Sequence, residues 1–221
     1  MPTDGTLHPL MAAAPPRPAI PQLSQLDLVL ETPRLRLRPF QERDVDDIWP
    51  VVSNPDFPKM MSWAAHTDRT ETLGFVRAIT KNLEQNGGVV WAIEHDARVI
   101  GSIGLDSMVF ALRAWRMDRA ELGFWLAQEH WNRGLMTEAA DAAVRCAFQT
   151  IGLHKVTVGC IAENVASRRV IEKLGFRYVG RLEDDVWRDG RWHSHLRYEL
   201  TAPEWPDVHT TSRFAYNPNA T

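Results

Sequence analysis

Hydrophobic and polar residues alternate along the chain with a period that changes from one segment to the next. A period of two is typical of a strand with one buried face, and a spacing of three or four is typical of a helix with one buried face. We expect strands, some of them short apolar runs, at residues 34–40, 88–95, 98–106, 119–127, 154–162, 177–187 and 191–200. We expect helices at residues 42–54, 70–86, 135–151 and 165–174.

Turn residues indicate how these segments are joined. Asp-Ala at residues 96–97 separates two apolar strands, and Asp-Gly at residues 189–190 separates the last two, so we expect two β-hairpins. Asn164 can cap the last helix, and Gly175 is suited to end it, because glycine accepts the left-handed conformation that follows many helices. The order β-α-α-β-β-β-α-β-α-β-β predicts a single mixed α/β (α+β) domain.

The two ends of the chain lack these patterns. Residues 1–26 are rich in proline and alanine, and proline prevents regular helix because it has no backbone N–H. Residues 206–221 also resemble a tail. We therefore expect a folded domain at residues 27–205 between two tails.

Composition narrows the class of protein. The 221 residues carry a formal net charge of −3. The chain is not basic enough for a general nucleic-acid surface and not acidic enough for a disordered chain. Cys146 and Cys160 lie inside a helix and a strand pattern, so we expect small buried side chains rather than a disulfide or a zinc site. No apolar run reaches the roughly 20 residues that span a bilayer, and residues 1–26 do not resemble a secretory signal. We expect a soluble, cytoplasmic protein without direct nucleic-acid or membrane contact.

The turn Asn132-Arg133-Gly134 precedes a helix that has no Ser, Thr or Asp as an obvious cap. Free N–H groups at a helix start need another partner, and together with the positive end of the helix dipole they bind phosphate well. Gly134 allows close approach to the backbone, and Arg133 adds a positive charge. The residues alone leave two alternatives, an anion site or a plain strand-to-helix connection. Neither a P-loop nor a glycine-rich dinucleotide motif is present.

Two longer motifs resemble the GNAT superfamily of acetyl-CoA-dependent N-acetyltransferases, and its RimJ/RimL-type branch in particular. The family's pyrophosphate loop, R/Q-x-x-G-x-G/A, falls on residues 131–136, with Trp131 and Met136 at two positions that depart from the pattern. The second motif, N-x-x-S-x-R-x-x-E-K-L-G-F, falls on residues 164–176. The resemblance covers roughly residues 28–205. It implies a GNAT-like acyl-CoA N-acyltransferase fold: a central, mostly antiparallel, twisted sheet with a splayed strand pair, flanked by helices.

The resemblance implies acetyl-CoA as cosubstrate and no metal. The turn would hold the pyrophosphate, and the pantetheine arm would lie where the strand at 119–127 splays from the strand at 154–162. The residues that it predicts for the coenzyme are Phe124, Trp125, Leu126, Trp131, Asn132, Arg133, Gly134, Leu135, Met136, Thr137, Asn164, Ser167, Arg169 and Lys173.

The implied reaction is the attack of an amine on a thioester. Most amines are protonated at neutral pH, so a base must remove a proton, and a backbone N–H near Trp125 and Leu126 would stabilise the oxyanion. The thiolate leaves readily, with a pKa of about 8.5 if cysteine is its model, so a weak acid is enough. By resemblance to RimL-like enzymes we assign this role to Ser167. Its alternative role is to satisfy a backbone N–H at the helix start.

Three carboxylates are candidates for the base, with Glu121 and Asp184 ahead of Asp185, and the sequence leaves the choice open. Glu121 lies on the strand at 119–127, where several family members carry a carboxylate that works through water. Asp184 lies in the region of the RimL base and shares strand parity with Val186, where the RimL glutamate aligns. The neighbouring Asp185 could attract a cationic amine. Each of these acids could equally be surface charge.

The segment at residues 57–67 resembles the acceptor-side loop of the family, so Met60 and Trp63 are predicted to line the amine site; alternatively they cover one end of the core. The acceptor is a protein N-terminus, as for ribosomal-protein relatives, or a polyamine, an antibiotic or another small amine. A homodimer is common in the branch. Two other classes stay open: a non-catalytic acyl-CoA-binding module and a phosphate-ligand enzyme of another kind.

Other aromatic and imidazole side chains have simpler interpretations. Of the nine tryptophans, we expect Trp91, Trp125 and Trp187 to pack in the core. His193 and His195 share one strand face but have no third ligand at a useful spacing. We therefore expect surface or substrate-wall positions for them rather than a metal site.

Overall fold

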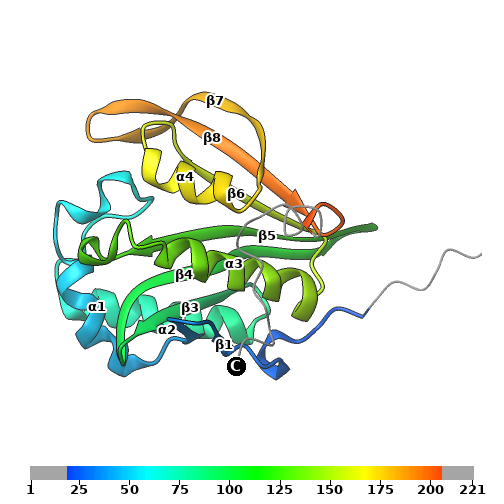
Figure 1. The fold of residues 1–221 in the computed structure, drawn as a ribbon, viewed down its shortest axis with the longest axis horizontal. Helices are drawn as coiled ribbons and strands as arrows, with labels where there is room; N and C mark the ends of the chain where they lie inside the picture. The colour runs from blue at the N-terminus through cyan, green and yellow to red at the C-terminus, as the bar shows by residue number, and fades with distance from the viewer. Residues whose placement is uncertain (1–18, 206–221) are drawn as a thin grey trace, which may run out of the picture.

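The structure, a computed structural model, describes residues 19–205; residues 1–18 and 206–221 of the two expected tails lie outside it. One eight-stranded sheet runs through the described chain in the order β1-β2-β3-β4-β5-β6-β8-β7 (Figure 1). The strands are β1 Leu30–Glu31, β2 Arg36–Pro39, β3 Val89–His95, β4 Arg98–Leu112, β5 Trp115–Leu126, β6 Lys155–Ile161, β7 Arg177–Arg188 and β8 Arg191–Thr201. The helices are α1 Val45–Val52, α2 Arg69–Glu84, α3 Leu135–Arg145, extended by a π-helical turn at Cys146–Thr150, and α4 Val165–Lys173.

The expected elements are present in the expected order. Both residues of the β3–β4 turn have positive φ, 50° at Asp96 and 61° at Ala97, which is the geometry of a tight hairpin turn. The two-residue β1 was not predicted, because it is too short to show an alternation. The β4–β5 hairpin is longer than expected and reaches Leu112 and Trp115, and α1 ends at Val52.

Helices cover both faces of the sheet, because alternate residues of a strand point to opposite sides. On one face Trp91 of β3 belongs to the same core as Ala139 of α3. On the other face Trp125 of β5 shares a second core with Ile48 of α1 and Val76 of α2. Figure 1 shows α3 in front of the strands and the β7–β8 hairpin at the top of the view. The sheet therefore separates the α3 face from the α1–α2 face.

Trp91 and Trp125 are buried as expected, but the prediction for Trp187 is wrong, since this side chain is 60% exposed. Its strand, β7, is the last strand of the sheet, and most of its residues are exposed. Trp187 packs edge to face against Trp192, with ring centroids 5.4 Å apart. Cys146 is buried and free, as the sequence predicted, and so is Cys160.

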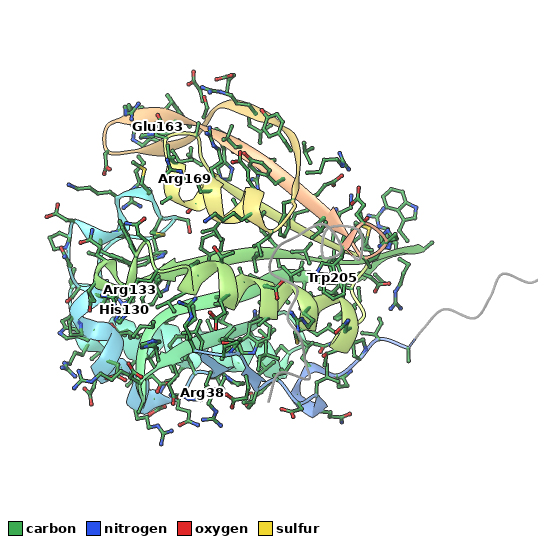
Figure 2. All side chains as sticks on the ribbon, viewed as in Figure 1. Arg38, His130, Arg133, Glu163, Arg169 and Trp205 are labelled. Carbon is green, nitrogen blue, oxygen red and sulfur yellow. The ribbon has the colours of Figure 1, made fainter. Side chains whose placement is uncertain are left out.

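The folded unit begins before the expected boundary at residue 27. Leu23 is fully buried, and its backbone N–H donates to Oδ1 of Asn86 at 2.8 Å. The amide nitrogen of Asn86 donates back to the carbonyl of Pro21 at 2.8 Å. Residues 21–26 therefore belong to the domain. At the other end, Trp205, which is labelled in Figure 2, packs against Phe148.

The parallel strands β5 and β6 pair along part of their length. Their ladder runs from Arg119 to Leu122 on β5, whereas β5 continues to Leu126 and β6 continues to Ile161. All other neighbouring strands in the sheet are antiparallel. The splayed strand pair is thus confirmed, and it begins at Gly123.

Candidate active site

A cavity of about 970 Å³ opens where β5 and β6 separate. Its walls come from β4, β5 and β6, from the start of α4, from the β7–β8 hairpin, from α2 and from the segment at residues 60–66. It lies on the α1–α2 face, since Trp125, which packs with those helices, is one of its lining residues. The cavity therefore collects side chains from both halves of the split sheet.

Part of the cavity floor is bare backbone. Gly104 of β4 and Gly123 of β5 are cross-strand partners, and both line the cavity. A Cβ added at Gly123 would meet no heavy atom of the described residues within 4 Å. The next pair of residues on the same face is Asp106 and Glu121. A ligand can lie directly on the backbone here, with two carboxylates at its edge.

The two carboxylates differ in their surroundings. Glu121 accepts a hydrogen bond at 2.8 Å from Nη1 of Arg197, which lies on β8 across the split. Burial, and after it the negative charge of Glu121, raises the pKa of Asp106. Glu121 lines the cavity, and so does Asp106, whose position could not be read from the sequence.

On the far wall, β7 brings Asp185 into the cavity and leaves Asp184 outside its lining. The register of β7 against β8 shifts between Leu182 and Val186, and Asp184 has a positive φ of 47°. A bulge of this kind interrupts the alternation of side chains. The expectation that Asp184 shares the side of Val186 is therefore wrong.

Asp185 faces an imidazole of β8. Its Oδ2 lies 3.5 Å from Nδ1 of His195, which also lines the cavity. Burial, followed by the charge of Arg197, lowers the pKa of His195 and favours the neutral imidazole. His195 is thus part of the cavity wall, one of its two expected positions, whereas His193 is buried and does not line the cavity.

The start of α4 forms another edge of the cavity, with Asn164 and Ser167 in its lining. Oδ1 of Asn164 accepts the backbone N–H of Ser167 at 3.1 Å, so Asn164 caps the helix as predicted. Because Asn164 performs the capping, the hydroxyl of Ser167 is available to a ligand in the cavity.

The segment at residues 57–67 reaches the cavity through Met60 and Trp63. The ring of Trp63 lies against Phe57 at 6.1 Å and against His66 at 5.7 Å between centroids, so the wall is largely aromatic. Arg188 of β7 holds this segment. Its Nη1 donates to the carbonyls of residues 61 and 63 at 2.8 Å and 2.9 Å.

The turn before α3 has the geometry that an anion site requires. Gly134 stands at the N-cap position with φ +77°, and Asn132 has φ 60°. Because glycine has no side chain, the N-cap residue makes no side-chain hydrogen bond to the first N–H groups of α3. Arg133 is exposed near the start of α3 (Figure 2). Arg34 donates from Nη1 to the carbonyl of Arg133 at 2.9 Å and forms an ion pair with Glu138 at 2.6 Å. Arg34 is therefore a second cation beside this turn.

The remaining residues predicted for the coenzyme occupy several kinds of position. Phe124 and Trp125 line the cavity, and Leu126, Leu135 and Met136 lie in the buried core. Thr137 is partly buried, and Trp131, Arg169 and Lys173 are exposed.

Four residues of this region were missed by sequence reasoning, namely Arg34, Asp106, Arg188 and Arg197. The three arginines bond to partners from distant parts of the chain, and the place of Asp106 depends on strand register, so the local sequence pattern around each of them carries no signal. Among residues 19–205, no group of three or more His, Cys, Asp or Glu side chains is placed to hold a metal ion. No helix in the described part of the chain is long and apolar enough to cross a membrane.

Comparison with known proteins agrees with this geometry. The family model described as the acetyltransferase (GNAT) domain matches residues 34–177. The Bacillus subtilis (strain 168) protein named uncharacterized N-acetyltransferase YoaA is 25% identical over 177 residues, which are 79% of this chain and 97% of that protein. The ribosomal protein uS5-alanine N-acetyltransferase of Escherichia coli (strain K12) is 33% identical over 84 residues, 38% of this chain and 43% of that protein.

Solved structures show the same fold. Mycobacterium smegmatis RimJ, in complex with CoA-disulfide, superposes with a TM-score of 0.70 at 22% sequence identity. The superposition covers 80% of this chain and 88% of that one.

Proposed function

This chain belongs to the GNAT acetyltransferase family, and we propose that it transfers the acetyl group of acetyl-CoA directly to a primary amine bound in the cavity between β4, β5 and β6. The observation that carries the proposal is the split between β5 and β6, which opens this cavity on the strand that leads to the turn before α3. Acetyl-CoA needs both features, because its pantetheine arm carries amides and its other end carries a pyrophosphate.

The backbone of β5 offers the partners for the pantetheine arm. The N–H of Ala127 donates to Ile100 of β4 at 2.9 Å, and successive N–H groups of a strand point to opposite sides. The N–H groups of Leu126 and Phe124 therefore face β6 and the split. They suit the amides of the arm and, nearer the thioester, the oxyanion of the tetrahedral intermediate. The carbonyl of Leu126 already accepts Nε1 of Trp131 at 2.6 Å.

The turn before α3 is the proposed site of the pyrophosphate. Backbone N–H groups of residues 135–137 and the positive end of the helix dipole favour an anion there. Arg133 adds a positive charge, and Arg34, whose own charge is paired with Glu138, fixes the carbonyl of Arg133. Residues Asn132, Gly134 and Met136 take part through their backbone, since the Met136 side chain lies in the core.

The reaction runs without a covalent enzyme intermediate. The deprotonated amine attacks the thioester carbonyl, the C–S bond breaks, and Ser167 delivers a proton to the leaving sulfur. Of the carboxylates considered for the base, Glu121 and Asp185 line the cavity and Asp184 does not. The aromatic wall with carboxylates at its edge suits a protonated primary amine. A protein N-terminus is the favoured acceptor, on the model of the uS5-alanine N-acetyltransferase, and a small amine is the alternative.

Thermal unfolding with acetyl-CoA tests the ligand directly. A ligand at 100 times its dissociation constant stabilises the folded state by about 2.7 kcal/mol, so the midpoint rises clearly with acetyl-CoA and with CoA, but not with ATP. Equal midpoints with and without millimolar acetyl-CoA would contradict the assignment.

Charge reversal separates the pyrophosphate turn from general electrostatics. We expect Arg133→Glu to abolish the acetyl-CoA shift at a concentration that shifts the wild type, because a carboxylate would repel the pyrophosphate. Arg133 is preferable to Gly134, whose positive φ strains any other residue. Arg43→Glu is the matched control, since Arg43 is exposed beside α1. A shift in Arg133→Glu as large as in Arg43→Glu would contradict this location.

The acceptor is identified by thiol release from acetyl-CoA with a panel of amines. The panel contains peptides that begin with Ala, Ser or Met, spermidine, and an aminoglycoside. Peptide turnover would support the N-terminal acceptor, and acetyl-CoA binding without turnover of any amine would favour a binding module.

We also propose a cytoplasmic location and a homodimer, which fractionation and light scattering would test.

A further inference from the structure

The carboxylate pair on the cavity floor stands at the point where the sheet splits. Asp106 and Glu121 are directly opposite each other on β4 and β5. Their neighbours on the same face are Gly104 and Gly123, and Gly123 is the first residue beyond the β5–β6 ladder. A Cβ added at Gly104 would lie 3.0 Å from Oδ2 of Asp106, so the open backbone is that of Gly123. An amine on Gly123 therefore has the split on one side and the two carboxylates on the other.

Glu121 is already engaged. Nη1 of Arg197 donates to its Oε1 at 2.8 Å, and both side chains are partly exposed. The guanidinium of Arg197 therefore holds the Glu121 carboxylate in place beside Asp106.

Asp106 has no such partner. No hydrogen bond or ion pair links its carboxylate to another side chain among residues 19–205, and it lines the cavity. On the β3 side the backbone of Asp106 lies against Gly88, which has no side chain, and its Oδ2 lies 3.0 Å from the position of a Cβ added at Gly104. Its carboxylate is therefore free to accept a proton from a ligand.

We propose that Asp106 is the group that takes the proton from the acceptor ammonium, and that Glu121, held by Arg197, is a positioning residue that acts through Asp106. This inference rests on the proposed acetyl transfer.

The step balances as follows. The carboxylate of Asp106 takes one proton from R–NH3⁺ and becomes a carboxylic acid, which leaves neutral R–NH2. The amine nitrogen forms a bond to the thioester carbon, and the C–S electron pair then leaves on sulfur. The second proton of the attacking nitrogen goes to that sulfur through Ser167, and Asp106 returns its proton to water.

The charges around Asp106 favour this role. Glu121 on β5 is the charged group that acts on it, and together with burial it raises the pKa of Asp106. A base whose pKa lies nearer to the working pH accepts a proton from an ammonium more readily. The other charged or titratable side chains around the cavity are Asp185 and Arg188 on β7, His195 and Arg197 on β8, Cys160 on β6, and His66.

The test compares Asp106→Asn, Glu121→Gln and Asp96→Asn in the full chain, with the best amine of the panel. Asp96 lies in the exposed turn at the far end of the same hairpin, roughly 30 Å along β4, and its positive φ suits asparagine. Each variant is first checked for a wild-type thermal shift with acetyl-CoA, so that loss of the coenzyme site is recognised separately. The readouts are kcat, the pH profile of kcat/KM, and titration of the Asp106 carboxyl by NMR in ¹³C-aspartate-labelled protein.

We expect Asp106→Asn to lose about 100-fold or more in kcat while it still binds acetyl-CoA, since positioned bases contribute about 10²–10⁴-fold. Glu121→Gln should lose less and move the acid limb of the profile, and the Asp106 signal, to lower pH. Asp96→Asn should match the wild type. The proposal is overturned if Asp106→Asn stays within about 3-fold of the wild type, or if Glu121→Gln removes the acid limb and Asp106→Asn keeps it. If no amine is turned over, an Asp106 signal that titrates at the ordinary carboxyl value overturns it as well.

Discussion

Asp106 places an ionisable group where the folded protein disfavours its charge. Burial and the nearby Glu121 raise its pKa, so folding favours the protonated form. Ionisation of Asp106 lowers the free energy of unfolding. This loss of stability grows as the pH rises from the pKa of Asp106 in the unfolded chain through its pKa in the folded protein. A functional site commonly contains a group of this kind.

Asp106→Asn is therefore expected to stabilise the protein at pH 8. It should lose most of this advantage as the pH falls to about 4, where the carboxyl starts to be protonated in the unfolded chain too. Urea unfolding at the two pH values measures the difference, with Asp96→Asn as the control. A wild type that is more stable than Asp106→Asn at pH 8 would contradict the sign of the shift.

The two thiols give a second prediction at this scale. Burial raises the pKa of Cys146 to about 11, and it raises the pKa of Cys160 to about 11 as well. The thiolate is the reactive form, so both residues should resist alkylation at pH 8 in the native protein and react fully in urea. Mass spectrometry after iodoacetamide checks this. Rapid labelling of native Cys160, which lines the cavity, would contradict it.

Residues that work through their own neighbourhood could be predicted from the sequence. Asn164 caps α4, and Gly134 adopts the positive φ that the turn before α3 needs. Asp106 and Asp184 could not be placed, because each depends on the pairing of two strands. The register of β4 against β5 joins Asp106 to Glu121, and a bulge in β7 turns Asp184 away.

At the scale of elements, the hydrophobic period was sufficient for the central strands and all four helices, because their buried faces are long enough to repeat. It was insufficient for β1, which has two residues. It also gave the wrong burial for Trp187, because β7 is nearly all exposed and shows no buried face. The contact between the acceptor-side segment and the β7–β8 hairpin was also invisible. It depends on one side chain, Arg188, which joins parts of the chain about 125 residues apart.

Arg188→Gln should loosen the aromatic wall, because the two carbonyl groups lose their shared donor. We expect a several-fold higher KM for the amine and an unchanged thermal shift with acetyl-CoA. Arg191→Gln is the matched control on the same hairpin, since Arg191 makes an exposed ion pair with Glu163, which contributes little. Equal KM values in the two variants would exclude this role of Arg188.

At the scale of the whole molecule, the domain extends further toward the N-terminus than its hydrophobic pattern shows. Leu23 is fully buried, although it stands in a proline-rich segment without periodicity. Its burial depends on Asn86, which follows α2 and bonds this segment on both sides. Such a contact between distant segments leaves no local trace in the sequence.

Leu23→Ala is expected to lower the free energy of unfolding by about 2–5 kcal/mol, as for other fully buried leucines. Ile20→Ala, three residues earlier and 42% exposed, should change it by less than about 0.5 kcal/mol. Urea unfolding compares them. A small effect of Leu23→Ala would show that residues 21–26 are dispensable for the domain.

The short ladder between β5 and β6 has a mechanical consequence. Strands β1–β5 and strands β6–β8 are two consecutive halves of the chain, and four residue pairs form the seam between them within the sheet. A molecule that fills the split would bond to both halves and link them across this seam. The domain would then be stiffest when loaded and would loosen after each turnover, so that product release and relaxation of the sheet become one event.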